Sequence, residues 1–238
     1  MDKLFEYFSK MIRETNIEFH RYIYSRINWE SRMIGLTGPS GVGKTTLVLQ
    51  HIKENLDWNG SLEVTAEDFY FASHRWLDLA DNFVKMGGKY VCVDEMHKYK
   101  DWSKELKLMY DYHSELHVVF TGSSILDINK GASDLSRRAV MYQMQGLSFR
   151  EFLQLFHHIP SEIYSLQDII AHKVEIPGLE HPLPLFHEYL QKGYYPFALE
   201  NDYDIRLRQI LNLTLESDIP QFADMNVSTG RKLKQLLA

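Results

Sequence analysis

The sequence predicts an α/β fold in which a mostly parallel sheet precedes a helical subdomain. Short apolar segments alternate with helical stretches between residues 33 and 144, and strand signals almost vanish after Phe149, where prolines separate further helices. Strands that alternate with helices join through right-handed crossovers and so form parallel sheets. A length of 238 residues allows one such domain with a smaller appendage.

The individual elements follow from local patterns. Leu4, Phe8 and Ile12 recur at helical spacing and predict a helical arm at the N-terminus. Strands are expected at 33–36, 61–64, 90–93, 117–120 and 139–144. Helices are expected at 44–56, 76–85, 101–113, 150–156, 163–172, 185–192 and 204–215, with a last one beginning at Ser228. The expected organisation is an N-terminal arm (residues 1–30), a sheet core (31–147) and a helical region (148–238) in which a C-terminal part is cut short.

Composition excludes several classes of protein. Apolar residues make up 45% of the chain and charged residues 24%, which argues against disorder. No uninterrupted apolar run approaches the roughly 20 residues of a membrane span, and the charged N-terminus is unlike a signal peptide. The net charge of −6 means that nucleic acid is not the default partner, and a single cysteine excludes an intrachain disulfide. We therefore expect a cytoplasmic protein with no membrane association.

A glycine-rich segment follows the first expected strand and fits the pattern G-x-x-x-x-G-K-[ST]. Its glycines allow successive backbone N–H groups to surround a phosphate at the positive end of the following helix. The lysine would reach the β- and γ-phosphates, and the threonine hydroxyl would bind Mg²⁺. The expected nucleotide-binding residues are Gly38, Pro39, Ser40, Gly41, Val42, Gly43, Lys44, Thr45 and Thr46.

Two carboxylates end the expected strand at 90–93. Asp94 would act with Thr45 in binding Mg²⁺, and Glu95 would orient and deprotonate the attacking water. Acidic residues also occur there as ordinary turn residues. Residues 94–97 (DEMH) match the DExH box of a helicase. Such helicases clamp nucleic acid between two sheet domains, and this chain has room for only one. Because an N-K-x-D box for guanine is absent, the sequence favours ATP over GTP.

Two further places could contribute to catalysis. The strand at 117–120 leads into hydroxyl residues, of which Thr121 and Ser123 could sense the γ-phosphate or position water; a serine-rich turn that caps a helix is the alternative. Arg138 precedes the last strand and could reach the phosphate of a neighbouring subunit as an arginine finger. A surface salt bridge is the alternative for Arg138.

Together these segments resemble a prokaryotic family of AAA+-type P-loop ATPases whose helical lid leads into a winged-helix and nuclease-like C-terminal region. The resemblance rests on GPSGVGKTTLVLQ, VCVDEMHKYKDW, VVFTGSS and LSRRAVMYQMQGLSFREFL. It implies the sheet order 5-1-4-3-2 and a helical lid. It also implies roles for Lys44, Thr45, Asp94, Glu95, the hydroxyl groups of TGSS and Arg138. Gly146 stands where the family often has proline.

These observations predict a Mg²⁺-dependent ATPase that binds ATP or ADP and couples hydrolysis to a conformational change. One alternative is a nucleotide-gated switch with negligible turnover, and another is a small-molecule kinase. A homo-oligomer formed through Arg138, and a DNA or protein partner in a longer chain, would be compatible with the resemblance.

Overall fold

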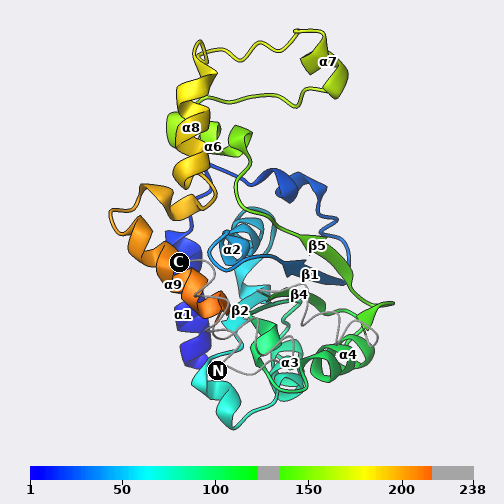
Figure 1. Ribbon diagram of the computed structural model, residues 1–238. Helices are drawn as coiled ribbons and strands as arrows, with labels where there is room; N and C mark the ends of the chain where they lie inside the picture. The colour runs from blue at the N-terminus through cyan, green and yellow to red at the C-terminus, as the bar shows by residue number, and fades with distance from the viewer. Residues whose placement is uncertain (123–134, 216–238) are drawn as a thin grey trace.

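The computed structural model describes residues 1–122 and 135–215. At its centre is a five-stranded parallel sheet (Figure 1). Its strand order is β2-β3-β4-β1-β5, so the predicted order is confirmed. All neighbouring strands pair in parallel, and Leu36 of β1 lies between Thr121 of β4 and Tyr142 of β5. The strands are β1 (Met33–Thr37), β2 (Ser61–Thr65), β3 (Tyr90–Asp94), β4 (His117–Gly122) and β5 (Val140–Gln143).

Helices cover both faces of the sheet (Figure 1). Helix α2 (Lys44–Asn55) lies over one face, and α3 (Trp76–Lys85) with α4 (Trp102–Tyr112) lies over the other. Helix α1 (Asp2–Glu14) packs against α2 and β2 through its buried apolar side chains. Strands β1 to β4 are largely buried because they have a helical layer on each side, which explains their continuous apolar runs. Strand β5, at the edge of the sheet, is largely exposed.

The N-terminal arm continues beyond α1 into a short 3₁₀-helix, η1 (Tyr22–Arg26). The side chain of Gln50 on α2 donates to the carbonyl oxygens of Asn16 and Phe19, both at 2.8 Å. These bonds hold the segment between α1 and η1 against the helix that follows the glycine-rich loop.

The helical region after β5 contains α6 (Phe149–His157), α7 (Leu166–Ile170), α8 (Pro182–Lys192), the 3₁₀-helix η5 (Pro196–Leu199) and α9 (Tyr203–Leu213). Helices α6 and α8 pack together, and α7 lies at the tip of a long excursion between them (Figure 1). Helix α9 returns towards the sheet domain (Figure 1). A helical region therefore follows the sheet, as predicted.

Two predicted helices differ from the structure in where they begin or end. The helix expected over 163–172 has only five residues, because Ser165 and Asp168 form a capping box that starts it and His172 adopts a left-handed conformation beyond its end. Helix α8 begins three residues before the expected start, since Pro182 is tolerated in a first helical turn. Over residues 1–122 and 135–215, no helix is long and apolar enough to cross a membrane.

Candidate nucleotide-binding site

The glycine-rich loop connects β1 to α2 and depends on backbone conformations that favour glycine. Gly38, Gly41 and Gly43 have φ angles of 155°, 82° and 96°. A Cβ atom on Gly38 would also collide with the carbonyl oxygen of Met144. Gly43 is the N-cap residue of α2, so the loop ends at the positive end of that helix. This geometry suits an anionic ligand.

Lys44 is buried at the start of α2, with only 5% of its surface exposed. Its ammonium group donates to the carbonyl oxygens of Gly38 at 3.0 Å and Pro39 at 3.2 Å. The same nitrogen lies 3.7 Å from Oε1 of Glu95. The structure therefore brings the lysine of the loop beside the acidic end of β3.

The hydroxyl groups of two threonines converge on Asp94. Thr45 donates to Asp94 Oδ2 at 2.9 Å, and Thr121 donates to Asp94 Oδ1. Thr121 also accepts a hydrogen bond of 3.0 Å from the backbone N–H of Glu95. The ends of β3 and β4 and the start of α2 thus meet at one carboxylate, as expected for the carboxyl ends of adjacent parallel strands.

Glu95 follows β3 in a left-handed conformation with φ of 51°, which is uncommon outside glycine. Burial raises the pKa of its carboxyl group above the ordinary value; the charge of Lys44 opposes this effect and that of Asp94 reinforces it. Its Oε2 atom lies 3.6 Å from Nε2 of His97. A half-buried carboxylate with a raised pKa is suited to accept a proton.

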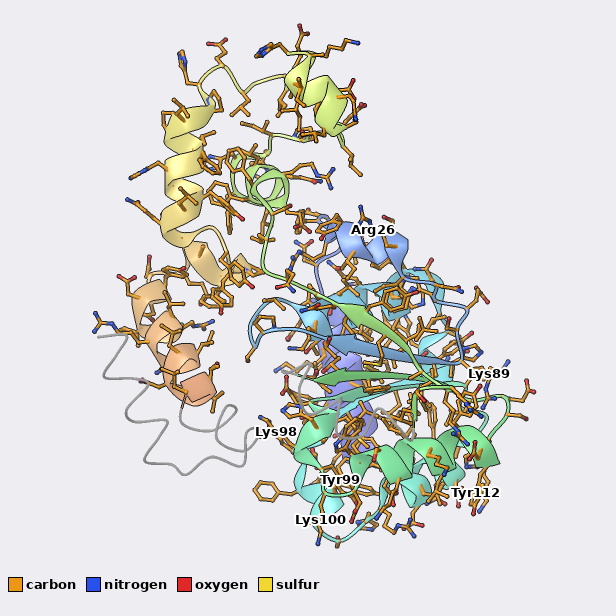
Figure 2. The ribbon with its side chains drawn as sticks, turned by 45° about the vertical axis from the view of Figure 1, so that its right-hand side comes forward. Arg26, Lys89, Lys98, Tyr99, Lys100 and Tyr112 are labelled. Atoms are coloured by element: carbon orange, nitrogen blue, oxygen red, sulfur yellow. The ribbon has the colours of Figure 1, made fainter. Side chains whose placement is uncertain are left out.

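A cavity of about 420 Å³ contains these groups. Its walls include Lys44, Thr45, Asp94 and Glu95, and Leu213 of α9 closes part of it. Glu67 and Lys98 also line the cavity and form an ion pair of 2.9 Å. Figure 2 shows Lys98 at this end of the sheet and Lys89 at the opposite end. Helix α9 therefore contributes to a pocket built by the sheet domain.

A second cavity, of about 540 Å³, adjoins the glycine-rich loop. Its mostly apolar wall combines Phe19 of the N-terminal arm, Leu47 of α2 and Pro196 of η5. Gly43 and Thr46 line both cavities, so the two lie on either side of the beginning of α2. This second cavity has the apolar character that a nucleobase or another flat organic group requires.

Oxygen ligands for a magnesium ion are present in the first cavity. Mg²⁺ prefers hard oxygen donors, keeps several of its waters and is commonly held by one or two protein groups together with substrate phosphates. The hydroxyl of Thr45 and the carboxylate of Asp94 fit that description. Among the residues that the structure describes, no three His, Cys, Asp or Glu side chains are grouped closely enough to hold a metal by themselves.

The structure places Arg138 away from both cavities. Its guanidinium forms two hydrogen bonds with Asp111 of α4, from Nε to Oδ1 at 2.8 Å and from Nη2 to Oδ2 at 2.9 Å. Arg138 precedes β5, at the amino ends of the strands, whereas the phosphate loop follows the carboxyl end of β1. Tyr112, the neighbour of Asp111, lies towards the Lys89 end in Figure 2. Ser123 lies outside the described residues.

Sequence reasoning missed two residues beside the loop, Arg21 and Glu151. They form a buried ion pair of 2.8 Å between the N-terminal arm and α6. A signal for Glu151 was available, because Ser148 and Glu151 form the S-x-x-E pattern of a capping box. Nothing near Arg21 in the sequence marks it, since the hydrogen-bond partners of its side chain are at least 21 positions away.

Comparison with known proteins identifies the family. The model of a family described as "AAA domain" matches residues 30–153, more than half of the chain. A solved structure of C. elegans PCH-2 aligns with a TM-score of 0.39 and 16% sequence identity over 76% of this chain and 49% of PCH-2. The chain thus spans about half the length of that protein. No curated protein gave a significant match. On the family match, the chain belongs to the AAA domain family of P-loop ATPases.

Proposed function

We propose that this protein binds ATP with Mg²⁺ and hydrolyses it to ADP and phosphate. The observation that carries the proposal is the convergence of Lys44, Thr45, Asp94 and Glu95 on one cavity beside a glycine-rich loop. A positive side chain, a hydroxyl and carboxylate pair, and a second carboxylate are the groups that phosphoryl transfer to water needs. Residues 38–46 form the nucleotide-binding segment in this proposal.

The four side chains divide three roles among them. Lys44 neutralises charge on the β- and γ-phosphates, and it must exchange its contacts with Gly38 and Pro39 for phosphate oxygens. Thr45 and Asp94 hold Mg²⁺, which supplies charge neutralisation for the phosphates when bound. Glu95 accepts the proton of the attacking water, and the N–H bond to Thr121 fixes the backbone that carries it.

The two cavities together accommodate a nucleotide. The phosphates occupy the polar cavity, where the loop N–H groups and the end of α2 favour negative charge. The base occupies the apolar cavity between the N-terminal arm and Pro196. Adenine is favoured over guanine because the sequence lacks the N-K-x-D box.

Contacts between the helical region and the loop would couple nucleotide binding to the position of the helical region. A Cβ atom on Gly41 would lie 2.9 Å from Cε1 of Phe197 and 3.2 Å from Cδ1 of Ile210, so η5 and α9 rest directly on the loop. A nucleotide that enters beside the loop makes different contacts with these helices from those of the empty site. Such differential contacts are the physical requirement for a nucleotide-dependent movement.

Arg138 acts in a neighbouring subunit in this proposal. It lies at the amino ends of the strands, so it cannot approach the phosphates of its own chain without large rearrangement. A guanidinium that completes another subunit's site must first leave Asp111. The same proposal includes a homo-oligomer formed through Arg138 and a cytoplasmic location. It also includes a DNA or protein partner in a longer chain.

The test is phosphate release from ATP by the purified protein, measured with Mg²⁺ and with excess chelator, over a range of protein concentrations and with and without DNA. Mg²⁺-dependent turnover supports the proposal. Tight ATP binding without phosphate release would favour the nucleotide-gated switch. Transfer of a labelled γ-phosphate to a small molecule in an extract would favour the kinase.

A further inference from the structure

Arg21 joins the N-terminal arm to three other segments through one guanidinium group. Its Nη1 donates to the carbonyl oxygen of Val42 at 2.7 Å, and its Nη2 donates to those of Gln145 and Gly146, both at 2.8 Å. Its Nε donates to Oε1 of Glu151 at 2.8 Å. The side chain is buried, with 6% of its surface exposed. The planar fork of arginine is suited to such simultaneous bonds, and lysine cannot reproduce them.

Glu151 completes this junction from the first turn of α6. Its carboxylate accepts hydrogen bonds from the backbone N–H groups of Tyr22 at 2.9 Å and Ser148 at 2.8 Å. Burial alone would raise the pKa of Glu151, but the hydrogen bond and charge of Arg21 outweigh it and hold the pKa below its ordinary value. The pair is therefore ionised and well satisfied.

The bond to Val42 has a particular consequence for the loop. An anion site made of backbone N–H groups requires the peptide carbonyls of the same loop to point away from the ligand. Val42 is fully buried, so its carbonyl oxygen needs a donor inside the protein. Arg21 supplies that donor. Without it, the peptide between Val42 and Gly43 could turn its oxygen towards the phosphates, which would repel them.

We infer that Arg21 is a positioning residue that fixes the Val42–Gly43 peptide in its anion-binding orientation and links the phosphate loop to the N-terminal arm and α6. This inference rests on the proposed function, because it concerns the affinity of the same loop for phosphate. When phosphate binding orders the loop, the bonds of Arg21 transmit this ordering to η1 and to the first turn of α6. By reciprocity, loosening the arm weakens nucleotide binding.

A matched pair of variants separates this role from simple stabilisation. Glu151→Gln removes the negative charge and keeps an oxygen acceptor, with Arg21 still bonded to Val42. Adding Arg21→Met removes every donor while keeping a long side chain, and it leaves no unpaired charge at the junction. Arg26→Met, a change of an exposed arginine on the same arm (Figure 2), is the control.

Calorimetric titration with ADP and thermal unfolding are measured for all four proteins. The Arg26→Met protein should bind ADP as the parent does. The double variant should bind ADP about tenfold more weakly than the Glu151→Gln protein, or worse, as expected when one buried acceptor loses its donor. Equal ADP affinity in the single and double variants would overturn the inference. A parent that fails to bind ADP would instead overturn the proposed function.

Amide hydrogen exchange of the unaltered protein gives a test that does not depend on the folding of an Arg21 variant. Inorganic pyrophosphate with Mg²⁺ has no base, so it contacts the loop without entering the apolar cavity. It should slow exchange in residues 19–27 and 149–157 as well as in the loop, and the Lys44→Ala protein should show no such change. Slowing confined to residues 38–46 in the parent would contradict the transmission through Arg21.

Discussion

Thr45 and Asp94 are hydrogen-bonded to each other at 2.9 Å although they lie 49 positions apart in the chain. The bond joins the first turn of α2 to the end of β3, and the hydroxyl of Thr121 holds the other oxygen of the same carboxylate. The groups that the proposed hydrolysis would use together are thus already held by protein contacts. Preorganisation of this kind reduces the reorganisation that catalysis would otherwise require.

Lys44→Ala should abolish detectable nucleotide binding. In the proposed site the change removes the cation that would neutralise the phosphates. We therefore expect ADP affinity to fall about 100-fold or more, at the upper end for a charged hydrogen-bonded group. Isothermal titration calorimetry with ADP measures it. Lys104→Ala, which changes an exposed lysine of α4, is the control. Unchanged ADP affinity in Lys44→Ala would show that the loop does not bind phosphate.

Glu95→Gln should retain ATP binding and lose turnover by roughly 10²- to 10⁴-fold, the range for a general base. The amide has nearly the same shape as the carboxyl group but cannot accept the proton. Because burial raises the pKa of Glu95, activity of the parent should already decline on acidification at a higher pH than an ordinary glutamate would give. Phosphate release measured against pH tests both points, and hydrolysis at the parent rate would exclude Glu95 as the base.

Thr121→Val should impair the acidic end of β3 without touching the loop. It leaves Asp94 Oδ1 and the N–H of Glu95 without their hydroxyl partner, at a cost of about 1–3 kcal/mol for each buried group. We expect a higher Mg²⁺ concentration for half-maximal hydrolysis and a lower melting temperature. Thr121→Ser, which keeps the hydroxyl, should restore both. Equal Mg²⁺ dependence of Thr121→Val and the parent would argue against a role in holding Asp94.

Arg138→Ala should nearly silence hydrolysis and spare ATP binding, because an arginine finger contributes about 10³- to 10⁵-fold to turnover. If Arg138 acts in trans, the specific activity of the parent should rise with protein concentration. Mixing Arg138→Ala with Lys44→Ala should leave only rare competent interfaces, each with an intact site facing an intact finger. Parent-like activity of Arg138→Ala at concentrations where the parent assembles would refute the assignment and leave the salt bridge with Asp111 as its role.

Glu63→Gln should stabilise the protein at pH 8. Glu63 is buried on β2, and its Oε2 has no hydrogen-bond partner within the described part of the chain. Burial, reinforced by the charge of Asp94, raises the pKa of Glu63 from 4.5 to about 8. The folded state therefore favours the protonated form, and stability is lost as the pH rises from 4.5 towards 8, by up to about 1.4 kcal/mol per pH unit.

Urea unfolding at pH 5 and pH 8, with chelator and no nucleotide, measures this loss. The Glu63→Gln protein should lose less stability than the parent over that interval, and Glu115→Gln, a change of an exposed glutamate, should behave like the parent. Identical pH dependence in Glu63→Gln and the parent would mean that Glu63 is ionised in the folded protein.

The sequence by itself determined the sheet and the chemistry that follows its strands. Apolar segments of four or five residues and the glycines of the phosphate loop are local signals, because period, turn residues and backbone freedom depend on neighbours in the chain. The meeting of Lys44, Asp94 and Thr121 could also be anticipated, since carboxyl ends of parallel strands lie at one edge. The family resemblance supplied the strand order that the structure confirms.

Only the tertiary structure decided which distant groups satisfy one another. Arg21 bonds to Val42 and Glu151, and Arg138 bonds to Asp111, across 21 to 130 positions that no local pattern relates. In the sequence Glu63 looks like an ordinary strand residue. The burial of its Oε2 atom without a hydrogen-bond partner among the described residues emerges only when helices cover the sheet. Desolvation and long-range hydrogen bonding are properties of the packed chain, and they set the charge state and orientation of these side chains.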